Sequence, residues 1–141
     1  MRNAKMTTAL VAIGLVLAPA SLRAADPAPD AAAAAKGRLT YVRYCVSCHG
    51  PQATGDGPLA RDLRVPVPDL TTLAQRSGGK FPQDRVVQVI QAGESVRGHG
   101  TADMPAWGDA FKKTKGTGEA TVDAAIRNLS QYLRTLQQTA R

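Results

Sequence analysis

Apolar side chains recur at helical spacing in four stretches of the chain. The clearest stretch is 121–138, where one face carries Val122, Ala125, Ile126, Leu129, Tyr132, Leu133 and Leu136. Two short helices are expected before it. The first begins after its cap residue Asp69 and ends at the glycine pair 78–79. The second has Pro82 in its first turn and ends at Gly93. Their inward-facing residues are expected to be Leu70, Leu73, Ala74, Val86, Val89 and Ile90.

The fourth stretch, residues 32–44, predicts a helix that delivers its last turn to Cys45. Leu39, Tyr44 and either Tyr41 or Val42 suit one face of it.

Gly37 lies inside this predicted helix, where glycine costs up to about 1 kcal/mol relative to alanine. We therefore expect another helix to cross closely at this point. The predicted helix 121–138 would bring Tyr132 against the face formed by Gly37 and Tyr41.

Between these helices the chain is punctuated by glycine and proline. The segment 50–59, GPQATGDGPL, predicts a tight loop, and the segment 65–68, VPVP, predicts extended backbone.

The first quarter of the chain differs from the rest. Arg2 and Lys5 precede an apolar run over 9–20, and small residues follow, which predicts a secretory signal peptide over 1–25. The run is shorter than the roughly 18 residues that span a bilayer, so no membrane span is expected in the mature chain. The segment 26–36 is expected to be a Pro/Ala-rich tether, and 37–141 the folded domain.

Charge gives little support for nucleic-acid binding. Removal of the signal peptide takes away three basic residues and no acid, so the formal net charge falls from +7 to +4. Aromatic residues make up 4% of the chain, too few for base-stacking platforms, and no nucleic-acid partner is expected. The same scarcity of aromatics leaves room in the core for a buried macrocycle.

The two cysteines of the chain belong to one motif, Cys45-Val46-Ser47-Cys48-His49. C-x-x-C-H is the attachment signature of c-type haem: both thiols lie on one turn, facing the two vinyl groups, and the histidine binds the iron. Three alternatives are weaker. A thioredoxin-like redox pair needs a βαβ context, and a disulfide rarely forms between cysteines at this spacing in a helix. A zinc site would need His99 as its fourth ligand, together with the adjacent residues Cys48 and His49, whose side chains point in different directions.

A haem iron held by His49 has a sixth position. Met104, the one methionine left after removal of the signal peptide, precedes a proline beyond a polar loop, and its neutral sulfur would raise the reduction potential. His99, flanked by glycines, is the rival ligand, and an open sixth position is the third possibility. A haem-ligating histidine also donates its other ring N–H to a carbonyl, for which Pro58 or a near neighbour is expected.

In order along the chain, the pieces Gly37…Tyr41…CVSCHG, GDGPL, PDLT, MPAWG and AIRNLSQYLRTL resemble the single-haem class I c-type cytochromes. The resemblance covers residues 37–136 and is greatest to the small cytochrome subunits of C-family haem-copper oxidases. It implies an all-α fold with crossed first and last helices around one haem c, thioether bonds from Cys45 and Cys48, and axial ligands His49 and Met104.

The same resemblance implies a hydrogen bond from His49 to the Pro58 carbonyl. It also implies that Trp107, with Arg61 or Arg64, lines the haem edge.

The function expected from these features is one-electron transfer by a secreted, periplasmic, monomeric protein. Its partners would be a redox donor and a redox acceptor that dock transiently, and no catalytic role is expected. The alternatives are a small peroxidase-like haem enzyme in which His99 and Arg97 act near an open iron, a sensor, and a dedicated subunit of a larger complex.

Overall fold

The structure is a computed structural model that describes residues 27–92, 107–115 and 119–138. Within these ranges the secondary structure is helical and no strand is present, which confirms the all-α prediction. Predictions for the signal peptide, His99 and Met104 lie outside the described residues. The elements are α1 (Ala31–Tyr44), α2 (Val46–His49), the short 3-10 helices η1 (Ala60–Asp62) and η2 (Leu70–Thr72), α3 (Leu73–Arg76), α4 (Gln83–Ala92), α5 (Trp107–Lys115) and α6 (Glu119–Thr135).

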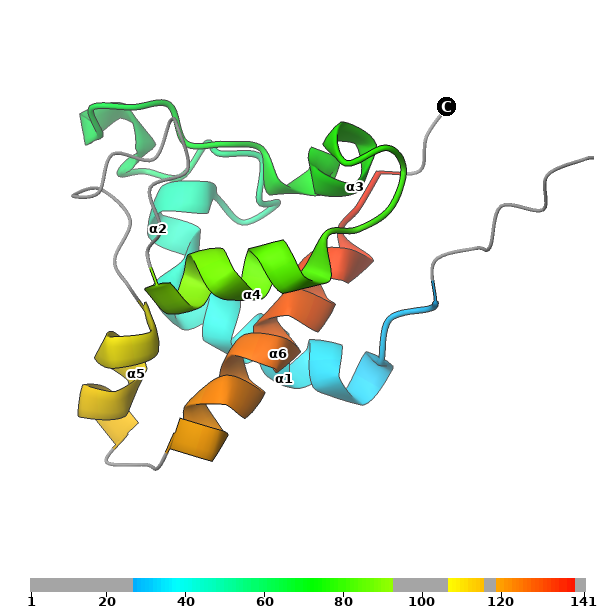
Figure 1. The fold of residues 1–141 in the computed structure, drawn as a ribbon. Coiled ribbons are helices and arrows are strands. Elements are labelled where there is room, and N and C mark those ends of the chain that lie inside the picture. Colours follow the sequence, from blue (N-terminus) through cyan, green and yellow to red (C-terminus); the bar gives the residue numbers. More distant parts are fainter. Residues whose placement is uncertain (1–26, 93–106, 116–118, 139–141) are drawn as a thin grey trace, which may run out of the picture.

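Helices α1 and α6 cross in direct backbone contact (Figure 1). The contact point is Gly37: a Cβ atom built there would lie 2.0 Å from the carbonyl oxygen of Asn128 and 2.8 Å from the backbone nitrogen of Leu129. Only a residue without a side chain allows this approach. The close crossing predicted at Gly37 is therefore confirmed.

Tyr41 lies one turn beyond Gly37 on the same face of α1 and is 1% exposed. Its ring packs on Tyr132 of α6 with the ring centroids 5.3 Å apart, as expected from the sequence. Its hydroxyl donates a hydrogen bond to the carbonyl oxygen of Gly50 at 2.6 Å. Burial, together with the nearby Cys45 and Tyr132, raises the pKa of Tyr41 well above its ordinary value, so the hydroxyl stays a neutral donor.

Helix α1 begins earlier than the predicted domain boundary. Asp30 caps it by accepting hydrogen bonds from the N–H groups of Ala32 and Ala33 at 2.9 and 3.0 Å. Ala34 is buried, and the N–H of Asp30 bonds to the side-chain oxygen of Gln131 on α6 at 3.2 Å. The last six residues of the segment expected to be a tether, 31–36, are thus helical.

The inward face of α1 differs from the one predicted. Ala34, Gly37 and Tyr41 are its buried residues, whereas Leu39 is 70% exposed and Val42 is 52% exposed. The assignment of Leu39 to the core side was therefore wrong, and of the two alternatives Tyr41 and Val42, Tyr41 is the buried one. Helix α1 carries apolar residues on two sides, so spacing alone could not decide which side α6 covers.

The middle of the domain follows the sequence prediction closely. The Asp69 carboxylate accepts a hydrogen bond from the N–H of Thr71 at 2.8 Å and caps the η2–α3 turn, which leads to the glycine pair 78–79 with φ of 71° and 90°. On α4, Val86 and Ile90 are buried and Val89 is half-buried. The core cluster that joins these helices consists of Tyr41, Ala53, Phe81, Val86, Ile90, Phe111, Val122, Ile126, Leu129 and Leu133.

Among the described residues, no helix has both the length and the apolar character needed to cross a lipid bilayer.

Replacing Gly37 by alanine tests the helix crossing. Because the added methyl group would meet backbone atoms that cannot rotate away, we expect the free energy of unfolding to fall by about 3 kcal/mol. Urea unfolding of the haem-loaded protein, followed by circular dichroism, measures this change. Arg38→Ala, at the exposed neighbouring position, is the control and should unfold at nearly the wild-type urea concentration. Equal midpoints for the two variants would contradict the crossing.

Replacing Tyr41 by phenylalanine tests the bond to Gly50. Loss of the donor leaves the buried Gly50 carbonyl with only the longer bond from the N–H of Ala53 at 3.2 Å, so we expect a loss of about 1 kcal/mol at neutral pH. Since the folded-state pKa of Tyr41 lies above that of an unfolded tyrosine, about 10, ionisation favours the unfolded state above pH 10. Stability of the wild type therefore declines above that pH, and the variant should lack this contribution to the decline.

The measurement is urea unfolding of both proteins at neutral pH and near pH 11. Tyr132→Phe keeps the bond to Gly50 and serves as the control. A Tyr41→Phe protein that loses stability with pH as steeply as the wild type would refute the assignment.

Candidate haem-binding site

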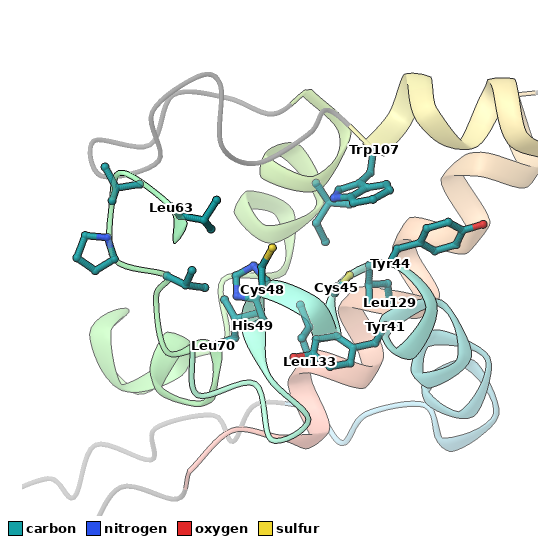
Figure 2. A pocket seen from close by; sticks show the side chains of 14 residues that line it. Tyr41, Tyr44, Cys45, Cys48, His49, Leu63, Leu70, Trp107, Leu129 and Leu133 are labelled. Atoms are coloured by element: carbon teal, nitrogen blue, oxygen red, sulfur yellow. The ribbon is translucent and has the colours of Figure 1, made fainter. Parts of the chain in front are cut away.

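One cavity of the described structure gathers the predicted haem-motif residues (Figure 2). Cys45, Cys48 and His49 lie on one side of it, and most of its remaining lining is apolar. The full lining comprises Tyr41, Tyr44, Cys45, Cys48, His49, Leu63, Val65, Pro66, Val67, Leu70, Ile90, Trp107, Leu129 and Leu133.

The motif itself forms the turn at the end of α1 and the short helix α2. The N–H of His49 bonds to the carbonyl of Cys45 at 2.9 Å, and the N–H of Cys48 bonds to the same carbonyl at 3.2 Å. Both thiols are free, so the disulfide alternative is not formed here. Burial, with Cys48 nearby, raises the pKa of Cys45 to about 12. The imidazole of His49 is buried, and Figure 2 shows it beside the thiol of Cys48, toward the cavity.

The loop 50–59 packs back onto the motif. The N–H groups of Gly55, Gly57 and Leu59 donate to the carbonyls of His49, Cys48 and Ser47, respectively, at 2.9, 3.1 and 2.9 Å. A Cβ atom on Gly57 would lie 2.5 Å from the carbonyl oxygen of Ser47, so only glycine fits. The glycine-rich composition of this loop is thus explained by close backbone packing that fixes α2.

Pro58 lies in this loop but does not line the cavity, and it is exposed. Its two neighbours in sequence bond to carbonyls of the motif, so its backbone runs alongside α2. His49 makes other contacts in the structure, but its buried Nδ1 atom forms no hydrogen bond to a described residue. The predicted bond between His49 and the Pro58 carbonyl stays a prediction.

Trp107 is held at the cavity by an aromatic cluster. Its ring centroid lies 5.3 Å from that of Tyr44 and 5.5 Å from that of Phe111, and the Tyr44 and Phe111 centroids are 4.9 Å apart. Tilted ring pairs at these distances are favourable packing arrangements. The first residue of α5 is thereby fixed against the end of α1, and its side chain lines the cavity. The place at the haem edge that the resemblance implies for Trp107 stays a prediction.

The segment 63–67 and Leu70 form a further wall of the cavity, and the sequence did not predict their place there. Leu63, Val65, Pro66 and Val67 line the cavity, and the N–H of Leu70 bonds to the carbonyl of Ala53 at 2.8 Å, which ties this wall to the loop 50–59. The available signal was a proline-flanked apolar segment outside any predicted helix. Arg61 and Arg64, predicted at the haem edge, are exposed and do not line the cavity, although their neighbours do.

No group of three or more His, Cys, Asp and Glu side chains that could hold a metal ion occurs among the described residues.

The residues at the cavity fit a haem in their chemistry. Two thiols at i and i+3 and one imidazole meet at one side of an otherwise largely apolar space, and aromatic and aliphatic side chains complete its walls. This combination suits a covalently attached haem: the thiols can bond to its vinyl groups, the imidazole can bind its iron, and the apolar walls can cover its flat ring.

Comparison with known proteins gives the same assignment. Residues 32–133 match the family described as cytochrome c oxidase, cbb3-type, subunit III. The chain is also 34% identical over 107 residues to the cbb3-type cytochrome c oxidase subunit CcoP of Azospirillum brasilense. This match covers 76% of the chain and 30% of that relative, so the chain spans less than a third of the relative's length. The chain belongs to the cbb3-type subunit III family, and its described domain is that of a c-type cytochrome.

Proposed function

We propose that this protein is a secreted one-electron carrier with a single haem c, bound covalently through Cys45 and Cys48. The observation that carries the proposal is the convergence of both thiols and the His49 imidazole on one apolar cavity. Haem supplies a reversible ferric–ferrous couple when bound. The residues of this chain attach it, supply its axial ligands and shield it from water.

Cys45 and Cys48 are the residues that would form the thioether bonds, and His49 would be the first axial ligand. All three are positioned by backbone bonds: those within the motif and those from the loop 50–59. These backbone hydrogen bonds hold the motif in place without a disulfide. The two thiols and the imidazole therefore all come from one short segment. The Pro58 carbonyl remains our candidate acceptor for the second ring nitrogen of His49.

Met104 is proposed as the second axial ligand. It lies three residues before Trp107, which lines the cavity, and three residues of chain span at most about 10 Å. That reach is enough for residue 104 to approach the same space. With His49 and Met104 both bound, the iron has no position for a substrate, so outer-sphere electron transfer is the chemistry that remains.

The partners follow from this assignment. We propose transient docking with a redox donor and a redox acceptor, of the kind made by small electron-transfer interfaces. The relative CcoP is a subunit of a cbb3-type oxidase, and a place next to such an oxidase is one version of this proposal. The signal-peptide pattern of residues 1–25 supports export to the periplasm, where the protein would act as a monomer.

Removal of both thiols tests the covalent attachment. In Cys45→Ala/Cys48→Ala, we expect no haem on the denatured chain, because thioether bonds require the two sulfur atoms. Mass spectrometry of the denatured protein measures this, and the wild type should carry the mass of exactly one haem. Ser47→Ala, at the exposed position between the cysteines, is the matched control and should retain it. Haem that survives denaturation on the double variant would refute the proposal.

Replacing Met104 by alanine tests the second ligand. We expect the haem to stay attached and the reduction potential to fall on the order of 100 mV, within the roughly 0.8 V range set by axial ligands. The iron should also bind carbon monoxide, which optical spectra of the reduced protein detect.

His99→Ala is the control for Met104→Ala and should keep the wild-type potential and exclude carbon monoxide. If the His99 variant shows both changes and the Met104 variant neither, His99 is the ligand. A wild-type protein that already binds carbon monoxide would favour the enzyme or sensor alternatives.

A further inference from the structure

The side of α1 away from α6 carries a line of exposed apolar residues. We call it the outer strip of α1, and it consists of Ala32, Ala35, Leu39 and Val42. All four are exposed, and Leu39 and Val42 are the most exposed large hydrophobic residues among those described, at 70% and 52%. The buried face of the same helix, with Gly37 and Tyr41, packs on α6.

The spacing in the outer strip is three, four and three residues. This is the a and d pattern of a heptad repeat, which places the four side chains along one narrow seam of the helix. A seam of this width suits contact with one further helix, whereas a helix that covers a broad core has a wider apolar face. The two alanines at the N-terminal half allow the backbone of such a helix to approach closely.

Basic residues flank the seam on both sides. In the heptad register, Lys36 and Arg43 occupy e positions and Arg38 occupies a g position, and all three are exposed. Helix α1 contains no acidic residue. A second copy of α1 on this seam would bring like charges together in the parallel and the antiparallel orientation, which opposes self-association. The complementary occupant is a helix with an apolar seam and acidic flanks.

A membrane surface would also attract basic flanks, but the seam fits it poorly. Helices that lie in a lipid interface bury a wide face rich in Trp, Phe and Leu. The outer strip offers one leucine, one valine and two alanines within a narrow line. We therefore propose that the outer strip of α1 is a docking surface for an amphipathic helix of a partner protein, with Asp or Glu flanking the apolar seam of that helix.

The proposal goes beyond electron transfer and does not depend on it. The test uses two synthetic three-heptad peptides with identical apolar a and d residues, one with Glu and one with Lys at every e and g position. Like charges keep each peptide from pairing with itself. We expect the haem-loaded protein to bind the Glu peptide roughly tenfold or more tightly than the Lys peptide, by fluorescence anisotropy at low salt.

Two variants assign the binding to the strip. Leu39→Ser/Val42→Ser should weaken binding of the Glu peptide roughly tenfold, and Lys36→Glu/Arg38→Glu should reverse the preference toward the Lys peptide. Leu59→Ser removes a large apolar side chain that is 49% exposed but lies outside α1, and it should leave binding unchanged. Circular dichroism and the haem spectrum check that each variant is folded.

Several results would overturn the proposal. The outer strip of α1 would not be a helix-docking surface if the protein bound both peptides equally or did not bind the Glu peptide. The same holds if Leu59→Ser weakened binding of the Glu peptide as much as Leu39→Ser/Val42→Ser does. Co-sedimentation with vesicles of phosphatidylcholine and phosphatidylglycerol that is lost in Leu39→Ser/Val42→Ser would assign the strip to membranes. A wild-type dimer in analytical ultracentrifugation that this double variant abolishes would assign it to self-association.

Discussion

The structure depends on one backbone contact, between Gly37 of α1 and the Asn128–Leu129 peptide of α6. Because no side chain separates the helices there, they cross at the closest distance that their backbones allow. One turn further along, Tyr41 packs on Tyr132 and reaches the Gly50 carbonyl, which links the crossing to the haem motif. Leu129 and Leu133 of α6 then face the same cavity as Cys45 and His49. The crossing therefore sets where the α6 wall of the site lies relative to the motif.

Much of this arrangement could be predicted because a few residue types have few uses. A glycine within a helix is costly unless something passes close to it, which made the crossing at Gly37 predictable. The spacing of the residues in the motif Cys45–His49 is sufficient to predict haem attachment. Asp69 marks the start of a helix through a local hydrogen bond, and the glycine pair 78–79 marks its end through positive φ. In each case the signal is local and physical, so it needs no knowledge of distant contacts.

The incorrect or missing predictions concern features that depend on contacts between residues far apart in the sequence. Helix α1 has apolar residues on two sides, and only the position of α6 selects Tyr41 for the core over Leu39 and Val42. The wall 63–67 lies at the cavity because the chain beyond Ala53 folds back, which no local periodicity records. The helix predicted over 32–44 is present, but the bond that ties its cap residue Asp30 to Gln131, near the other end of the domain, could not be predicted from local spacing.

The distribution of the cavity walls along the chain has a consequence for biogenesis. Cys45, Cys48 and His49 lie early in the sequence, whereas Leu129 and Leu133 belong to the last helix. In the exported protein that we propose, the thiols would reach the far side of the membrane before the wall that α6 supplies. Leu129 and Leu133 can contact the motif only after the last helix has crossed as well. The proposed thioether formation would thus have an interval in which both sulfur atoms are accessible, before α6 docks.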